Sequence, residues 1–226
     1  MMLAIPDILT PDEARMFRLE LEQTAWSDGR ASAGALAGRV KDNQQLADDN
    51  PLAARLGGLI LERLARSERF MQAALPLKVL PPRFNRYVGG GAYGDHVDSA
   101  VLSVPGAPLR LRGDLSATVF FSDPEDYDGG ELVIDSGLGE TRVKLPAGHM
   151  VLYSARTVHR VTPVTRGARF AAFFWIESMV RQGDRRAMLL DLDEAIGSLR
   201  ADTPDHPAVL RLTGLYHNLL REWADT

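Results

Sequence analysis

His96 and Asp98 stand two positions apart in the stretch 93–98, in a sequence that holds only five histidines. Side chains at positions i and i+2 of a β-strand point to the same face, so these two residues could bind one metal ion together. Two protein ligands rarely suffice for a transition metal, and His159, in the β-branched run 157–161, is the candidate third ligand. Two imidazoles and one carboxylate leave open positions on an octahedral metal. This ligand set indicates a non-haem Fe(II) site of the oxygenase type.

Arg169 follows His159 by ten residues and opens the almost entirely apolar stretch 169–176. An arginine that points into a barrel interior needs an anionic partner, because an unpaired buried charge is very costly. Its planar guanidinium suits bidentate recognition of a carboxylate. A small dicarboxylate could therefore chelate iron with one end and reach Arg169 with the other. The competing interpretation pairs Arg169 with an acid of the protein, and for an isolated arginine that interpretation is the stronger one.

Each candidate metal ligand also has a purely structural interpretation. His96 could be a structural or exposed histidine, Asp98 a turn residue after Gly94, and His159 a residue on a strand surface. A lone His-x-Asp pair is a short motif with a high false-positive rate. The context favours the metal site, because His159 follows six predicted strands and precedes the last, which suits the opposite wall of the same barrel.

The composition is that of an ordinary globular protein. The 226 residues are 45% hydrophobic and 25% charged, which fits one large domain or a domain with a small appendage. The absence of cysteine excludes disulfides, thiolate metal sites and a cysteine nucleophile. A net charge of -4 argues against nucleic acid as an obligatory partner. We expect a cytoplasmic protein with no membrane partner, because the first residues lack the basic region of a signal peptide and no apolar run approaches the roughly 20 residues that span a bilayer.

Helix-start signals stand on both sides of a β-rich centre. Thr10 is a candidate N-cap, and Glu13 completes a capping box. A second helix opens at Asn50, before a proline. After the centre, Asp184 and Thr203 mark the starts of two more helices.

Between these helices, short β-rich runs alternate with Gly, Pro and Asp turns. The link 99–113 is expected to be a flexible loop at the mouth of the site. About eight short strands with turn signals indicate a sandwich or barrel, with the jelly roll favoured. The predicted strands are 83–88, a run around 96–98, 115–122, 131–135, 141–145, 149–154, 158–164 and 168–176.

We therefore expect a mainly β fold with flanking α-helices: a double-stranded β-helix, or jelly roll, with N-terminal helices and a small C-terminal helical extension. The expected division is N-terminal helical support at 1–79, the jelly-roll core at 80–178 and the extension at 179–226. At about 45 residues the extension is too small to be stable alone, so it should pack on the barrel or on another subunit. Its apolar stripe ending at Trp223 is a candidate face for a homo-oligomer.

The motifs around these residues resemble those of the Fe(II)/2-oxoglutarate-dependent dioxygenases of prolyl-hydroxylase type, and more closely those of the bacterial PKHD-type hydroxylases. The resemblance covers essentially the whole chain, including the helical tail. The shared stretches are Phe84–Tyr87 with its glycine run, Gly94–Asp98, Asp114–Thr118, Pro124–Leu132, Lys144–Gly148, His159–Arg169 and Phe174–Met179.

The resemblance implies a 2-oxoglutarate-dependent hydroxylase, an oxidoreductase. His96, Asp98 and His159 would hold Fe(II), and Arg169 would bind the far carboxylate of 2-oxoglutarate. Tyr87 is a candidate hydrogen-bond donor to this cosubstrate. O2 would be consumed, a C–H bond hydroxylated, and succinate and CO2 released, with L-ascorbate (vitamin C) restoring oxidised iron. The substrate would be a protein or peptide, prolyl by analogy, or a small molecule such as a siderophore-related compound.

Three positions depart from the family pattern. Ser99 stands in place of Asn, His149 in place of Asp, and Glu177 in place of Gln. None of them belongs to the metal set or replaces Arg169, so the iron and cosubstrate assignments carry over, and Ser99 and Glu177 are the departures that bear on the substrate side. Metal-bound histidines must be neutral, so iron affinity is expected to fall below about pH 6.

Two other functions compete with the hydroxylase. One is a sensor module that binds iron and 2-oxoglutarate without efficient turnover. The other is a cupin-like metalloenzyme that does not use 2-oxoglutarate, which Arg169 disfavours because such a site has no use for a buried cation opposite the metal. Lys41, Asn43 and Gln44 could form a substrate-side wall, although an ordinary solvated loop is the favoured interpretation of that stretch.

Overall fold

The computed structural model describes residues 1–32, 37–103 and 110–225, and it shows two antiparallel sheets that face each other. Antiparallel sheets packed in this way form a jelly roll, as predicted. The larger sheet has the spatial order β1 (Met2–Ile5), β14 (Met150–Ser154), β10 (Leu115–Phe120), β16 (Val164–Ser178), β6 (Arg83–Val88), β4 (Gln44–Gln45) and β2 (Ser27–Asp28), and β11 (Tyr127–Gly129) and β5 (Pro76–Val79) pair with the two ends of β16.

The smaller sheet faces the inner side of the larger one. It carries two of the candidate metal ligands on neighbouring strands. Its order is β13 (Glu140–Val143), β12 (Leu132–Asp135), β15 (Val158–Val161), β7 (Ala92–His96) and β3 (Lys41–Asp42), and a separate pair is formed by β8 (Val101–Ser103) and β9 (Arg110–Arg112).

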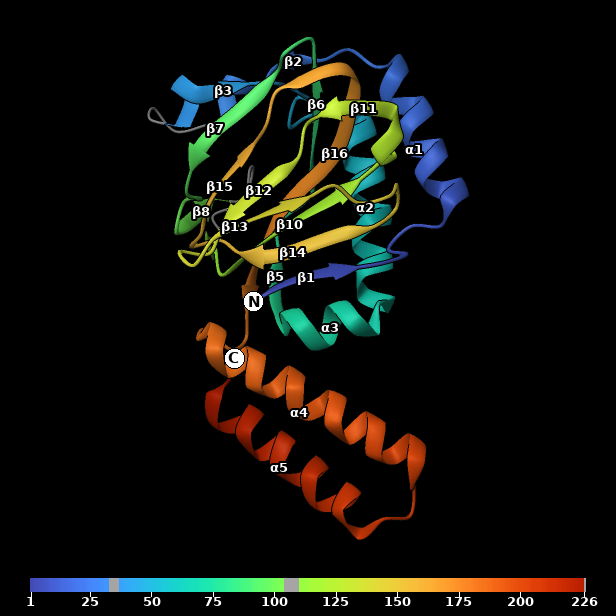
Figure 1. Ribbon diagram of the computed structural model, residues 1–226, viewed down its shortest axis with the longest axis vertical. Coiled ribbons are helices and arrows are strands. Elements are labelled where there is room, and N and C mark those ends of the chain that lie inside the picture. The colour runs from blue at the N-terminus through green and yellow to red at the C-terminus, as the bar shows by residue number, and fades with distance from the viewer. Residues whose placement is uncertain (33–36, 104–109, 226) are drawn as a thin grey trace.

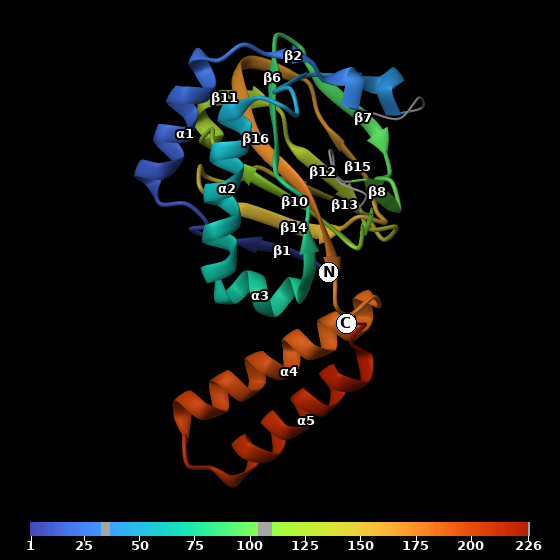
Figure 2. The ribbon, with the colours of Figure 1, turned by 180° about the vertical axis from the view of Figure 1, so that it is seen from behind.

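Three helices cover the outer face of the larger sheet (Figure 2). They are α1 (Pro11–Gln23), α2 (Pro51–Arg66) and α3 (Glu68–Ala74). The predicted capping box of α1 is present, with Thr10 and Glu13 exchanging hydrogen bonds between side chain and backbone. Apolar side chains of these helices form one buried cluster with the outward face of β16, which alternates at Phe170, Ala172 and Phe174. The inward face of the same strand is left to line the interior.

The first 79 residues contribute strands as well as helices. β1 extends the larger sheet beside β14, and β3 and β4 pair with β7 and β6. The sequence predicted only helices here, because strands of two to four residues are too short to show an alternating pattern. The link 99–113 also differs from the expected loop: β8 and β9 pair within it, and 104–109 lie outside the described residues.

Two long helices project from one end of the β-rich body, α4 (Gly183–Asp202) and α5 (Pro207–Trp223) (Figure 1). The apolar stripe of α5 packs in a cluster with Leu189 of α4 and Val180, so Tyr216, Leu219 and Trp223 are engaged within the same chain. None of the helices within the described residues is long and apolar enough to cross a membrane.

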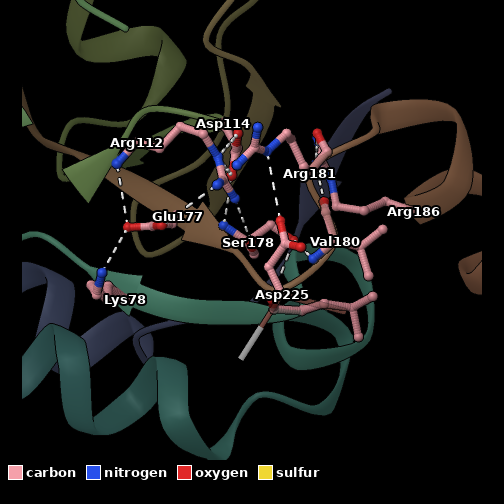
Figure 3. Close-up of polar contacts among 10 residues, drawn as sticks. Lys78, Arg112, Asp114, Glu177, Ser178, Val180, Arg181, Arg186 and Asp225 are labelled. Atoms are coloured by element: carbon pink, nitrogen blue, oxygen red, sulfur yellow. Dashed lines mark hydrogen bonds and ion pairs between the residues drawn. The ribbon is translucent and has the colours of Figure 1, made fainter. Parts of the chain in front are cut away.

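A polar cluster joins the end of β16 to the start of this helical extension (Figure 3). Arg112 donates to both carboxylate oxygens of Asp114, at 2.9 and 3.0 Å, and to the carbonyl oxygen of Ser178 at 3.0 Å. The backbone N–H of Ser178 donates to Asp114 at 3.0 Å. Glu177 belongs to this junction, since it pairs with Lys78 at 3.1 Å and does not line the cavity described below. The substrate-side role considered for it is not supported.

Replacing Asp114 with alanine is expected to lower the free energy of unfolding by about 2–4 kcal/mol, because the Arg112 guanidinium and the Ser178 N–H would lose their shared acceptor inside the protein. Urea denaturation followed by far-UV circular dichroism measures this. Asp128→Ala is the matched control, since Asp128 pairs with Arg166 on the exposed surface, where an ion pair contributes little. Equal losses in the two variants would contradict a structural role for the junction.

Candidate functional site

A cavity of about 140 Å³ lies between the two sheets. It is lined by His96, Asp98, His159, Arg169 and Tyr87, so every residue singled out for chemistry from the sequence faces the same space. These residues come from four strands and one strand end that are distant in the chain. The fold therefore builds a single site from them.

The three candidate metal ligands converge at one side of this cavity. His96 and His159 are directly opposite each other across β7 and β15. Their rings lie 4.2 Å apart, and Nε2 of His159 is 3.8 Å from a carboxylate oxygen of Asp98. One ligand atom from each residue lies within 4.8 Å of the others. Two nitrogens and one oxygen on one side of an ion leave the remaining coordination positions open, as Fe(II) of the oxygenase type requires.

Backbone carbonyl groups orient the two imidazoles. Nδ1 of His96 lies 2.8 Å from the carbonyl oxygen of Gly94, and Nδ1 of His159 lies 3.0 Å from that of Thr157. A carbonyl oxygen only accepts, so Nδ1 carries the proton and Nε2 keeps its lone pair for a metal. This is the tautomer in which histidine binds a metal through Nε2.

Neighbouring side chains also fix the positions of the metal ligands. Ser116 donates to the carboxylate of Asp98 at 2.5 Å, which ties the metal side of the site to the larger sheet. The ring of Tyr93 stacks on that of His96, with centroids 3.6 Å apart. Asp95, by contrast, is exposed and pairs with Arg160 at 3.2 Å, so it does not hold the metal ligands.

Arg169 lies across the cavity from the metal set and is only 1% exposed. It pairs with Tyr87 in the register of β16 and β6, and its guanidinium lies 5.4 Å from the Tyr87 ring centre and 5.0 Å from that of Phe120. Within the part of the chain that the structure describes, it forms no ion pair, and its Nε has no hydrogen-bond partner. The interpretation that an acid of the protein neutralises Arg169 is therefore wrong for these residues. A buried guanidinium with an unused donor fits an anionic ligand.

Tyr87 stands beside Arg169 and is itself buried. Burial raises the pKa of its phenol, an effect that the nearby Arg169 charge opposes. The phenol therefore stays protonated at neutral pH and is able to donate a hydrogen bond. It lies on the same wall as Arg169, which places a donor next to the cation.

A wall of the cavity comes from a stretch that the sequence did not assign to the site. Lys41 and Asn43 are buried and line the cavity, so the solvated-loop interpretation is wrong for both. Gln44 points elsewhere and accepts from Arg86 at 2.7 Å. Burial lowers the pKa of Lys41 to about 8, which still leaves it mostly charged at pH 7. Residues 41, 43 and 45 alternate as buried positions in the structure, but all three are polar, so the sequence carries no hydrophobic alternation that could have indicated it.

The metal-free protein is expected to lose stability as the pH falls from about 6.5 toward 4. Burial, and then the charge of His159, lower the pKa of His96 to about 4. The unfolded chain therefore binds a proton at His96 before the folded protein does, and acid favours unfolding across that interval. Protonation of His96 should therefore weaken iron binding only as the pH approaches 4. An unperturbed imidazole would weaken it already below about pH 6.

Thermal melting of metal-free protein between pH 7.5 and pH 4.5 checks this, with His96→Gln as the variant that should flatten the slope. The same pH profile for wild type and variant would contradict it.

Comparison with family models identifies two matching regions. Residues 82–177 match the 2OG-Fe(II) oxygenase superfamily, and residues 184–225 match the PKHD-type hydroxylase C-terminal domain. A PKHD-type hydroxylase of Nitrobacter winogradskyi is 60% identical over 226 residues, covering 100% of both chains. The PKHD-type hydroxylase PiuC of Pseudomonas aeruginosa is 53% identical over 225 residues, again with 100% of both chains covered.

Solved structures show the same fold at low sequence identity. A Pseudomonas putida prolyl-4-hydroxylase aligns with a TM-score of 0.55 at 16% identity, covering 78% of this chain and 92% of that one. A Trichoplax adhaerens prolyl hydroxylase in complex with a peptide fragment aligns with a TM-score of 0.56 at 17% identity, covering 83% and 86%. HygX of Streptomyces hygroscopicus, with nickel, 2-oxoglutarate and hygromycin B bound, aligns with a TM-score of 0.53 at 18% identity, covering 79% and 84%. With full-length relatives above 50% identity, the chain belongs to the PKHD-type hydroxylases of the 2OG-Fe(II) oxygenase superfamily.

Proposed function

We propose that this enzyme hydroxylates a C–H bond of an organic substrate at the cavity between the two sheets, with His96, Asp98 and His159 as the Fe(II) ligands and Arg169 as the anchor of 2-oxoglutarate. The observation that carries this assignment is the buried Arg169, which has no acid partner among the described residues and shares its cavity with the His-Asp-His set. When bound, iron and 2-oxoglutarate supply the oxidising chemistry, with O2 consumed and succinate and CO2 released.

The residues of the chain position and protect that chemistry. The carbonyl groups behind His96 and His159 fix the imidazoles with Nε2 toward the metal, and Ser116 fixes the carboxylate of Asp98. Arg169 offers a bidentate guanidinium to the far carboxylate of 2-oxoglutarate, and Tyr87 is the neighbouring donor for it. A buried lining strengthens these electrostatic contacts relative to water.

Ascorbate is proposed as the reductant that returns oxidised iron to Fe(II), by analogy with the family. A cytoplasmic location is part of the same proposal, because free Fe(II) and 2-oxoglutarate must both be supplied. The structural neighbours bind a peptide fragment in one case and hygromycin B in another, so the fold accommodates substrates of both kinds.

Anaerobic addition of 2-oxoglutarate to the Fe(II)-loaded enzyme tests the proposal. A weak visible metal-to-ligand charge-transfer band should appear and saturate with 2-oxoglutarate. Admission of O2 should then release succinate. Iron binding without a band or any affinity for 2-oxoglutarate would overturn the proposal in favour of a cupin-like site. A saturating band without succinate, with or without candidate substrates, would favour a sensor.

A further inference from the structure

Aromatic side chains surround the guanidinium of Arg169. Tyr87 is directly opposite Arg169 across β6 and β16, and its ring centre lies 5.4 Å from the guanidinium. The ring centre of Phe120, on β10, lies 5.0 Å from it. Both rings belong to one buried cluster, which also contains Tyr127, a residue that is 0% exposed. Tyr127 carries a polar hydroxyl group into this otherwise apolar surrounding.

The register of β16 places Tyr127 beside Arg169. Tyr127, on β11, is directly opposite Gly167. Gly167 and Arg169 point to the same face of β16, because side chains two positions apart on a strand do so. Tyr127 is thus the diagonal cross-strand neighbour of Arg169, at a separation that an aromatic and a long side chain can bridge. Gly167 permits this approach, since a Cβ atom there would lie 2.0 Å from the carbonyl oxygen of Asp126.

The phenol of Tyr127 interacts with the guanidinium of Arg169. Burial raises the pKa of Tyr127, and the charge of Arg169 and a side-chain hydrogen bond between the two residues oppose that rise. A guanidinium only donates, so the phenol oxygen is the acceptor. Within the described residues, Arg169 lines the cavity and Tyr127 does not. An effect of the phenol on a ligand in the cavity must therefore pass through Arg169.

The ring of Tyr127 is itself held in place by its surroundings. Lys144 donates to the carbonyl oxygen of Tyr127 at 2.6 Å, and its ammonium lies 4.0 Å from the centre of the ring. Gly130 lies so close to the ring that a Cβ atom at this position would be 2.8 Å from a ring carbon. A ring confined in this way holds its hydroxyl group in a fixed position relative to β16.

A fixed acceptor matters because a carboxylate is bound best when two N–H groups of the guanidinium face its two oxygens. The aromatic rings of Tyr87 and Phe120 attract the cation, but they do not define the direction of its N–H groups. No ion pair fixes Arg169 within the part of the chain that the structure describes. A hydrogen bond that orients the guanidinium before the ligand arrives reduces the ordering cost of binding.

We propose that Tyr127 is a positioning residue for the cosubstrate. Its phenol oxygen accepts a hydrogen bond from Arg169 and holds the guanidinium with its remaining N–H groups toward the far carboxylate of 2-oxoglutarate. This inference rests on the proposed hydroxylase function, in which Arg169 is the anchor of that carboxylate. Tyr127 acts only through Arg169, whereas Tyr87 lines the cavity and is able to reach the ligand itself.

The test compares two 2-oxo acids that differ only in the group that reaches Arg169. 2-Oxopentanoate has the chelating end and the chain length of 2-oxoglutarate, but a methyl group replaces the far carboxylate. Each acid is titrated anaerobically into the Fe(II)-loaded enzyme, and the charge-transfer band gives its affinity. In Tyr127→Phe the affinity for 2-oxoglutarate is expected to fall at least about fivefold, whereas that for 2-oxopentanoate should change less than about twofold. Retained binding of 2-oxopentanoate also shows that the variant is folded.

Tyr216→Phe is the matched control, because it removes a phenol oxygen from the helical extension, where Tyr216 packs with Val180 and Leu189. It should leave both affinities unchanged. A second comparison introduces Tyr127→Phe into Arg169→Ala. In that background it should weaken 2-oxoglutarate less than about twofold, because the residue through which Tyr127 acts is gone.

Two results would overturn the inference. Tyr127→Phe could change the affinities for the two acids by the same factor, including no change, which would leave Tyr127 a purely structural residue. It could also weaken 2-oxoglutarate equally with and without Arg169, which would indicate a route that does not involve the guanidinium. In both cases the band that the wild-type enzyme forms with 2-oxoglutarate still supports the proposed function. Absence of that band in the wild-type enzyme would overturn the function and the inference together.

Discussion

Arg169→Ala is expected to weaken 2-oxoglutarate binding at least 100-fold while Fe(II) binding is retained. The guanidinium is buried and has no acid partner among the described residues, so a carboxylate that reaches it forms charge-assisted hydrogen bonds inside the protein. Truncating one partner of such a buried pair costs about 2–5 kcal/mol, and a factor of 100 corresponds to about 2.7 kcal/mol. The measurement is the anaerobic titration of the charge-transfer band, with iron content determined in the same samples.

Arg166→Ala is the matched control for this variant. Arg166 lies on the same strand, three residues before Arg169, but its side chain is exposed and pairs with Asp128 at 2.8 Å. Its removal should leave the affinity for 2-oxoglutarate unchanged. If Arg169→Ala bound 2-oxoglutarate like wild type, the anchor of the far carboxylate would have to be another residue.

His159→Ala is expected to remove stable Fe(II) binding and to reduce O2-dependent succinate formation at least about 1000-fold. The chain provides three ligand atoms within 4.8 Å of one another, and loss of one leaves a two-ligand site. Mutation of a residue that only orients a metal ligand typically lowers metal affinity or activity 10–100-fold, so loss of a ligand itself should have a larger effect. Iron per protein after anaerobic loading and gel filtration, together with succinate release, measures the result.

The control for this variant is His149→Ala. His149 lies outside the metal set, directly before β14, and its Nε2 is 3.6 Å from a carboxylate oxygen of Asp7 near the N-terminus. Its removal should leave iron content at the wild-type level. Full iron loading of His159→Ala would mean that the metal is held by a different set of residues.

The residues of the metal set could be predicted from the sequence because their signals are local. The i, i+2 spacing of His96 and Asp98 survives in the structure as a shared face, and the apolar strand after Arg169 alternates as its period requires. The pairing of His96 with His159 could not be read from spacing alone, since it depends on the register between β7 and β15. The order of the strands along the chain and the family resemblance are the signals that indicate this pairing.

The inward-pointing segment 41–45 and the ion pairs of Glu177 at the end of β16 could not be predicted, for two different physical reasons. Strands of two residues, such as β3 and β4, have no measurable periodicity, and their inward polar residues look like a solvated loop. Glu177 differs because its partners Lys78 and Arg112 are 99 and 65 residues away in the chain. Ion pairs at such separations follow from tertiary packing and leave no local pattern. The sequence therefore indicated the metal ligands and Arg169, but it did not show that Lys41 and Asn43 line the same cavity.

The placement of the three tryptophans gives the molecule a set of natural optical reporters. Trp175 lines the cavity, Trp26 packs edge-on against Phe170 with ring centres 5.6 Å apart, and Trp223 lies under the Arg185 guanidinium in the helical extension. Each indole thus senses a different part of the structure: the site, the helix-covered face of the larger sheet, and the C-terminal helices. Emission from variants that keep one tryptophan at a time would follow ligand binding, barrel unfolding and detachment of the extension as three separable signals.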